Sequence, residues 1–155
     1  MKIILTMTTL IAGLAIFVAA ATADEHSGTW KLNPAKSKYS PGPGLKNLTE
    51  NVALDENSYK IDANGTAADG TPVHIEFNAR FDGKEYPMIG VPWADTVSVK
   101  RIDAHTPQMI QRKGGEVTMV ITCKVSGNRK TRTCTLKGWD EQGHKVNNVV
   151  VFDRQ

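Results

Sequence analysis

The sequence predicts an all-β domain built as a single antiparallel up-and-down β-barrel of about eight to ten strands. Three observations carry this prediction. Apolar and polar residues alternate in run after run along the chain, which is the period of a strand with one buried face. Turn-forming dipeptides separate these runs at short intervals, as in hairpins between neighbouring antiparallel strands. After residue 23, no segment carries a sustained apolar stripe of helical period.

The first segment of the chain is expected to be a leader rather than part of the fold. In the 155-residue sequence, Lys2 precedes an apolar run that contains no acidic residue and ends in Ala21-Thr22-Ala23. This is the pattern of a secretory signal peptide. We therefore expect residues 1–23 to be a signal peptide, residues 24–155 to form the barrel domain, and the protein to be exported to the periplasm or the extracellular space.

Ten runs qualify as strands. In chain order they cover residues 29–33, 46–54, 58–66, 72–80, 84–89, 96–102, 106–113, 116–125, 130–139 and 145–154. From Val73 to Arg80 every odd position is apolar and every even position is polar, and apolar residues again hold the odd positions from Val117 to Val125. A meander of this length closes on itself to remove its edges, and a barrel of this size can enclose one small ligand.

The connections between the runs are mostly short. Five of them contain dipeptides that tolerate positive φ: Asp69-Gly70, Asp82-Gly83, Gly114-Gly115, Gly127-Asn128 and Gln142-Gly143. Two connections depart from this pattern, because residues 34–45 are rich in proline and glycine and residues 88–95 include Gly90, Pro92 and Trp93. The sequence predicts long, irregular loops at these two places.

The formal charge excludes two kinds of partner. Nineteen Lys and Arg against 16 Asp and Glu give a net charge of +3, and the predicted leader contributes one positive charge, Lys2. Such a balance is not typical of a nucleic-acid arm or a polybasic membrane patch, so we expect no nucleic-acid partner. No second long apolar run follows the leader, so we expect no transmembrane segment. The oligomeric state stays open.

The start of the predicted domain resembles a known fold family. Gly28-Thr29-Trp30-Lys31-Leu32, ahead of a β meander, is similar to the opening of the calycin barrels, which include lipocalins and fatty-acid-binding proteins, and the string particularly resembles the latter. In such barrels the tryptophan plugs one end and often meets an arginine from the last strand. The resemblance therefore implies a buried Trp30 with Arg154 stacked on its ring by cation–π attraction.

Nearly all of residues 24–155 resembles a group of exported, lipocalin-like bacterial proteins. The strings that carry this resemblance are residues 28–43, 95–97, 100–103 and 146–149. The resemblance implies a fold and export but no specific activity. Fatty-acid-binding proteins have a helical lid after the first strand and an Arg-x-Tyr near the C-terminus, whereas this chain has the Pro/Gly loop and Phe152-Asp153-Arg154. A fatty-acid ligand therefore does not follow from the fold.

Three charged residues fall in an apolar register. Arg101 shares its strand face with Val97 and Val99, Arg132 with Cys134 and Leu136, and Glu50 with Leu48, Val52 and Leu54. An unpaired buried ion is costly, so each needs water or a partner. One interpretation places them at the ends of the barrel, where side chains reach water. In the other, Arg101 or Arg132 meets the polar head of an amphipathic ligand whose tail lies on Phe77, Val97, Val99 and Ile121.

Catalytic and metal motifs are weak. The histidines, His26, His74, His105 and His144, are scattered without metal-ligand spacing, so we expect them on the surface. The serines lack a nucleophile-elbow context. We assign no catalytic residue, cofactor or metal site and expect no enzyme.

Cleavage after Ala23 would expose Asp24-Glu25-His26 as a new N-terminus, which could chelate Cu(II) through its nitrogen atoms. The alternative is an incidental histidine in a polar terminus.

The two cysteines are predicted to form a disulfide. A hairpin that turns on Asn128-Arg129 places Cys123 opposite Cys134 on the same sheet face, within disulfide reach. An oxidising compartment favours the bond. A bulge at the turn would shift the register by one residue and leave two buried thiols instead.

Two functions from different classes remain open. The first is an exported module that holds one small apolar or amphipathic molecule inside the barrel. The alternative is a non-enzymatic interaction or structural module with a packed barrel, which acts through loops 34–45 and 88–95 with Tyr39 and Trp93 as anchors. An interior space of about 300 Å3 or more would favour the first.

Overall fold

The computed structural model describes residues 24–155, so the predicted signal peptide, residues 1–23, lies outside the described residues. Ten strands make up the fold: β1 (Gly28–Leu32), β2 (Asn47–Leu54), β3 (Ser58–Thr66), β4 (Pro72–Arg80), β5 (Tyr86–Ile89), β6 (Thr96–Asp103), β7 (Thr106–Lys113), β8 (Glu116–Val125), β9 (Thr131–Trp139) and β10 (Lys145–Arg154). Residues 24–155 contain no helix, and hence none with the length and apolar character needed to cross a membrane.

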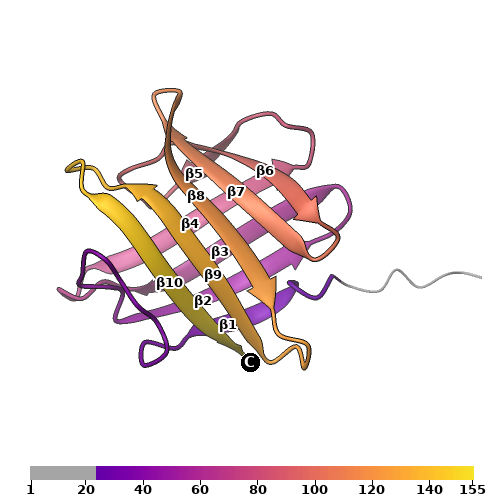
Figure 1. Cartoon of the computed structure of the whole chain (residues 1–155), viewed down its shortest axis with the longest axis horizontal. Helices are drawn as coiled ribbons and strands as arrows, with labels where there is room; N and C mark the ends of the chain where they lie inside the picture. Colours follow the sequence, from indigo (N-terminus) through magenta and orange to yellow (C-terminus); the bar gives the residue numbers. More distant parts are fainter. Residues whose placement is uncertain (1–23) are drawn as a thin grey trace, which may run out of the picture.

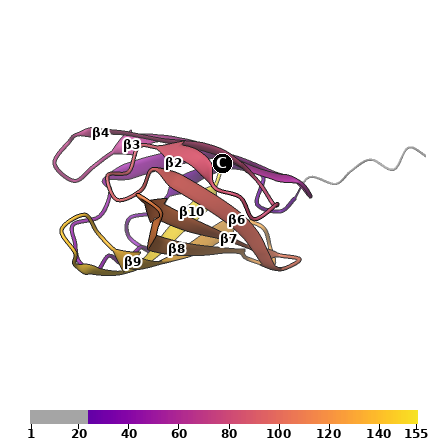
Figure 2. The same ribbon diagram turned by 90° about the horizontal axis from the view of Figure 1, so that it is seen from above.

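The strands form one closed antiparallel barrel (Figure 1). Each strand pairs with the next along the chain, and β1 closes the ring by pairing with β10, where Trp30 lies opposite Arg154. Figure 2 shows that the barrel is flattened, with β2–β4 across from β8 and β9. The predicted fold is therefore confirmed, and ring closure gives both β1 and β10 a partner where an open sheet would leave bare edges.

The alternating apolar and polar residues of each strand lie on the inner and outer faces of the barrel, respectively. On β3, Tyr59, Ile61 and Ala63 are buried, while Lys60 between them is exposed. On β8, Met119, Ile121 and Cys123 are buried in the same alternating way. Because successive side chains of a strand point to opposite faces, this period of two lines a single core with apolar side chains.

The hairpin between β8 and β9 has the predicted register. Ser126 and Thr131 close its turn through an N–H donated from Ser126 to the Thr131 carbonyl at 2.8 Å, and Arg129 adopts a positive φ of 58°. No bulge interrupts the ladder, so Cys123 pairs with Cys134 and the two form a disulfide. The predicted disulfide is confirmed.

The N-terminal segment and the start of β1 close one end of the barrel. Trp30 is fully buried and donates its indole N–H to the His26 carbonyl at 2.8 Å. The Arg154 guanidinium carbon lies 4.1 Å from the centre of the Trp30 ring, which is the stacking that the resemblance implies. Arg154 also donates to the carbonyls of Glu25 and Ser27, so one side chain ties the segment before β1 to the last strand.

The structure corrects the prediction for His26. The sequence predicts a surface position for this side chain, but it has no exposed area, and its Nε2 lies 3.0 Å from the His105 carbonyl oxygen. The cause is the anchored N-terminal segment, which turns the ring into the closed end of the barrel. A copper chelate by Asp24-Glu25-His26 would require this ring to leave the interior, so the folded arrangement does not favour it.

Acidification is expected to destabilise the fold through His26. Burial lowers the pKa of its ring below the ordinary value of 6.5, and the charge of Arg132 lowers it further, against the hydrogen bond with the His105 carbonyl. The unfolded chain therefore binds a proton at His26 more readily than the folded chain does. The stability that the neutral, buried ring allows is fully present above about pH 6.5 and is lost as the pH falls toward the lowered pKa. We expect urea unfolding from about pH 7.5 to about pH 5 to show stability that rises with pH, with a shallower slope in His26→Gln.

A matched variant separates the buried ring from the exposed ones. His144→Gln removes an imidazole that is 67% exposed and lies outside the core. If His26→Gln and His144→Gln give the same pH slope as the unchanged protein, then His26 does not carry the acid sensitivity of the fold.

The long loop between β1 and β2 is fastened to the barrel wall. Lys38 and Val149 exchange two backbone hydrogen bonds at 2.7 and 2.8 Å, and Asn147 donates its N–H to the Ser40 carbonyl at 2.8 Å. The predicted loop 34–45 is thus held against β10 rather than projecting from the barrel. This places its second half at the end of the barrel opposite Trp30.

Candidate functional site

The barrel contains a cavity of about 580 Å3. Antiparallel order brings the β1–β2, β3–β4, β5–β6 and β9–β10 connections to the same end, and residues from all four line the opening of the cavity. Its wall is mostly apolar and includes Leu48, Ile61, Ile75, Phe77, Met119, Ile121, Leu136, Val150 and Phe152. Glu50 and Arg132 also line the cavity, and Arg132 lies at the start of β9, toward the closed end of the barrel, so these two charged residues form the floor of the cavity.

Two loops shape the opening. Residues 41–45 follow Tyr39 along one side, and residues 90–93 form another. Trp93 is half-buried and donates its indole N–H to Gln111 Oε1 at 2.8 Å, which turns the ring inward. Gly90 has a φ of +94°, and a Cβ there would collide with the His74 carbonyl, so only glycine fits this close approach to β4.

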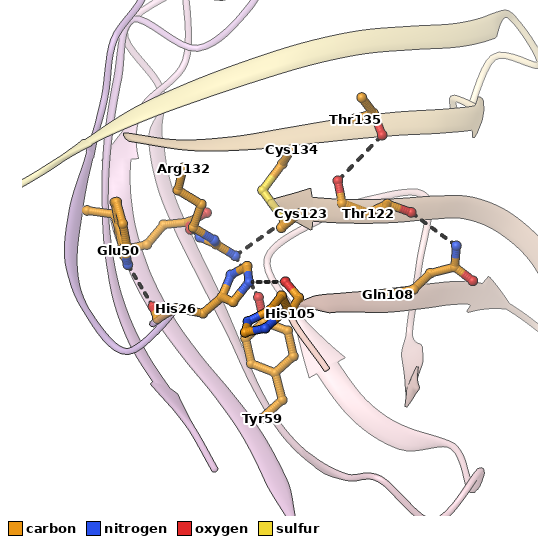
Figure 3. The surroundings of a disulfide bond; sticks show 11 residues. His26, Glu50, Tyr59, His105, Gln108, Thr122, Cys123, Arg132, Cys134 and Thr135 are labelled. Atoms are coloured by element: carbon orange, nitrogen blue, oxygen red, sulfur yellow. Dashed lines mark hydrogen bonds and ion pairs between the residues drawn. A yellow bond between two sulfur atoms is a disulfide. The ribbon is translucent and has the colours of Figure 1, made fainter. Parts of the chain in front are cut away.

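The charged residues at the floor of the cavity form a buried network (Figure 3). Arg132 on β9 donates to Glu50 Oε2 on β2 at 2.5 Å and to the Tyr59 hydroxyl oxygen on β3 at 2.6 Å. The disulfide packs beside the guanidinium, with Cys123 Sγ 3.4 Å from Nη2. The Arg132 side chain is 1% exposed and that of Glu50 is 12% exposed, so the ion pair is shielded from water.

Burial and pairing act together on the ionisation of these groups. Burial opposes the charge of Arg132, but Tyr59 and Glu50 outweigh it, and the pKa of the guanidinium is raised. Burial also raises the pKa of Tyr59, so its hydroxyl stays neutral at physiological pH. The floor therefore carries one positive and one negative charge in direct contact, and their sum is zero.

The structure brings together only part of the predicted ligand-binding set. Arg132, Phe77 and Ile121 line the cavity. Val97 and Val99 are fully buried in the core of β6 but lie outside the cavity lining.

Arg101 lies at the closed end, away from the cavity. It donates to an Asp24 carboxylate oxygen at 3.1 Å and to the Asp55 carbonyl at 2.9 Å, and its guanidinium lies 4.8 Å from the centre of the Phe81 ring. The β6–β7 register shifts between Arg101 and Asp103, at the end of the strand. This matches the interpretation that puts a charged residue at a barrel end.

Other lining residues were not assigned to a ligand site by the sequence. In the sequence, Glu50 is only a charge in an apolar register, and Tyr39 and Trp93 are predicted only as anchors of the interaction module. The opposite charges of Glu50 and Arg132, each on a buried strand face, were the signal that could have paired them. The predicted up-and-down order already puts loops 34–45 and 88–95 at the same end of the barrel, but only the closed ring makes both of them border one cavity.

A second group of polar residues lies on the outer face of β3 and β4. Asp62, His74 and Glu76 place one ligand atom each within 4.8 Å of one another, a spacing that a metal ion could use. The His74 Nδ1 already lies 2.9 Å from Asn64 Oδ1, and its side chain and that of Glu76 are each 45% exposed. This group faces solvent and is separate from the cavity.

Comparisons with known proteins agree with the fold. No protein-family model matches the chain, and no curated protein matches it by sequence. Among solved structures, the chain is similar to the zebrafish ileal bile acid-binding protein complexed with cholic acid, with a TM-score of 0.50 and 11% sequence identity. The match covers 85% of this chain and all of that one. At this identity the likeness shows a shared fold, a closed antiparallel β-barrel, and nothing about the ligand.

Proposed function

We propose that the protein is an exported barrel that binds one small apolar or amphipathic molecule in its interior. The cavity is the observation that carries this proposal. Its volume of about 580 Å3 lies within the range of about 300–1,000 Å3 that is usual for small-molecule sites. Its apolar wall and a few polar groups at one end are the usual composition of such sites.

The same cavity argues against the packed-barrel alternative. That alternative needs a filled interior and exposed aromatic anchors on loops 34–45 and 88–95. Instead, Tyr39 and Trp93 are half-buried and line the cavity. These loops therefore serve better as the rim of an internal site than as an external interface.

Phe77 and Ile121 would contact the apolar part of the ligand, and Arg132 would lie at its deep end. Arg101, Val97 and Val99 lie outside the lining and have no part in this proposal. The zebrafish protein with the similar fold was solved in complex with cholic acid, so a barrel of this fold can bind a small molecule. A binding role, rather than an enzymatic one, is also the role that the sequence predicts.

Export is supported by two independent features. The leader pattern of residues 1–23 predicts secretion. The disulfide between Cys123 and Cys134 would persist in an oxidising compartment such as the periplasm or the extracellular space.

A titration with an uncharged, polarity-sensitive naphthalene ketone probe tests the binding function. We expect residues 24–155 to bind the probe saturably, at about one site per chain and with micromolar affinity. Ile75 lines the cavity, so Ile75→Trp should fill it and weaken binding about tenfold or more. Fluorescence titration at constant protein concentration measures both the number of probe sites per chain and the affinity.

The control places the same substitution on the outside of the barrel. Ile89 is 54% exposed and does not line the cavity, so Ile89→Trp should leave the affinity unchanged. Unsaturable binding, or equal losses in both variants, would contradict an interior site.

A further inference from the structure

We infer that the cavity selects a neutral ligand whose deep end carries a hydrogen-bond-accepting oxygen, such as an alcohol, ketone or ester, and that Glu50 excludes the corresponding carboxylate. This inference rests on the proposed function and specifies the chemical class of its ligand. It reverses the role that the sequence suggested for Arg132, which was to hold an anionic head.

The first step is the charge of the floor. Glu50 lies 2.5 Å from the Arg132 guanidinium, so the positive charge is already matched. A ligand carboxylate at this depth would lose its hydration and meet the Glu50 carboxylate without an additional positive charge in the cavity wall. Like charges at short range disfavour ionisation, and a buried ion without its own partner is costly.

The second step is the set of unused donors. Within residues 24–155, three buried side-chain polar atoms have no hydrogen-bond partner: His26 Nδ1, Tyr39 Oη and Arg132 Nε. Two of the three belong to residues that line the cavity, Tyr39 and Arg132, and both atoms can donate. A buried donor without a partner is costly, so an acceptor oxygen on the ligand would stabilise the complex.

The third step is the position of Tyr39. Its ring lies against Gly44, where any Cβ would collide with it, so the loop of residues 41–45 holds the ring close. Burial raises the pKa of the Tyr39 hydroxyl, the backbone of Leu45 opposes this rise, and the charge of Glu50 adds to it, so that the pKa is raised. The hydroxyl therefore keeps its proton and stays a donor. Arg132 Nε thus offers an unused donor at the floor of the cavity, and the Tyr39 hydroxyl offers a second donor beside the loop of residues 41–45.

The experiment compares two ligands that differ only in their head group. Dodecan-1-ol and dodecanoate compete for an uncharged, polarity-sensitive naphthalene ketone probe at neutral pH, in the unchanged protein and in Glu50→Gln. The amide keeps an acceptor for Arg132 but removes the negative charge. We expect Glu50→Gln to improve dodecanoate binding about tenfold and to change dodecan-1-ol binding less than about threefold.

The control is Glu56→Gln, which removes the same charge from an exposed turn outside the cavity. It should change neither affinity. If dodecanoate binding falls or is unchanged in Glu50→Gln while the probe still binds, the inference is wrong and the proposed function stands. If neither ligand nor the probe binds saturably to the unchanged protein, the proposed function itself is wrong.

A second measurement needs no substitution and covers the case in which Glu50→Gln does not fold. The carboxyl carbon of 13C-labelled dodecanoic acid reports the ionisation of the bound ligand by NMR. Beside the Glu50 carboxylate, the pKa of the bound acid should be raised above its value in free solution. A lowered pKa would show that the ligand carboxylate pairs with Arg132, and it would overturn the inference.

Discussion

Replacing Glu50 by alanine is expected to lower the free energy of unfolding by about 3–5 kcal/mol. Arg132 is 1% exposed, and its Nη1 donates to Glu50 at 2.5 Å, so the substitution leaves a buried guanidinium without its counter-charge. Tyr59 still accepts one hydrogen bond but supplies no negative charge. Urea unfolding followed by fluorescence measures the loss.

The paired substitution decides whether the loss comes from the charge left behind. Glu50→Leu combined with Arg132→Met removes both ions and keeps a similar side-chain volume. The stability of this double variant should return to within about 1 kcal/mol of the unchanged protein or exceed it.

An exposed ion pair provides the matched control. Lys36 and Asp153 lie 3.5 Å apart and are 59% and 40% exposed, so Lys36→Ala should cost less than about 1 kcal/mol. A small cost for Glu50→Ala would mean that water reaches the floor of the cavity.

Replacing Trp30 by alanine is expected to cost about 3–5 kcal/mol, the range for truncation of a large buried aromatic side chain. The ring has no exposed area, and its loss leaves a void at the closed end of the barrel. It also removes the stacking partner of Arg154 and the donor that binds the His26 carbonyl at 2.8 Å. We therefore also expect Trp30→Ala to release the N-terminal segment from the barrel, which faster amide hydrogen exchange at residues 25–28 would show.

Trp139 provides the control within the same chain. It is 52% exposed at the end of β9, so Trp139→Ala should change stability by no more than about 0.5 kcal/mol. Equal effects of the two substitutions would contradict the closed end as described.

The strand pattern explains why so much of the fold could be predicted. Alternation is a local property, because successive side chains of a strand point to opposite faces. The run from Val73 to Arg80 therefore predicts its own strand, which the structure has as Pro72–Arg80. Turn chemistry is also local. Asn128-Arg129 defined the β8–β9 register closely enough to pair Cys123 with Cys134.

The candidate site followed less closely from the sequence. Phe77, Ile121 and Arg132 are on the cavity lining, but the same pattern also included Val97, Val99 and Arg101, which are not. Alternation tells which face of a strand is apolar, but it does not tell how far along the barrel a side chain lies. Depth depends on strand tilt and stagger, which are properties of the closed ring.

The sequence by itself determined the all-β class, the order and extent of the strands and the disulfide, and its resemblance to calycin barrels implied that Trp30 plugs one end. Only the tertiary structure decided which charges meet. Arg132 and Glu50 are 82 residues apart in the chain, and they lie on β9 and β2, which are not neighbours in the barrel. The N-terminal segment likewise turned His26 inward only because Arg154, at the other end of the chain, binds its carbonyls. Local rules act through neighbouring residues and adjacent strands, whereas these contacts cross the interior and exist only once the ring has closed.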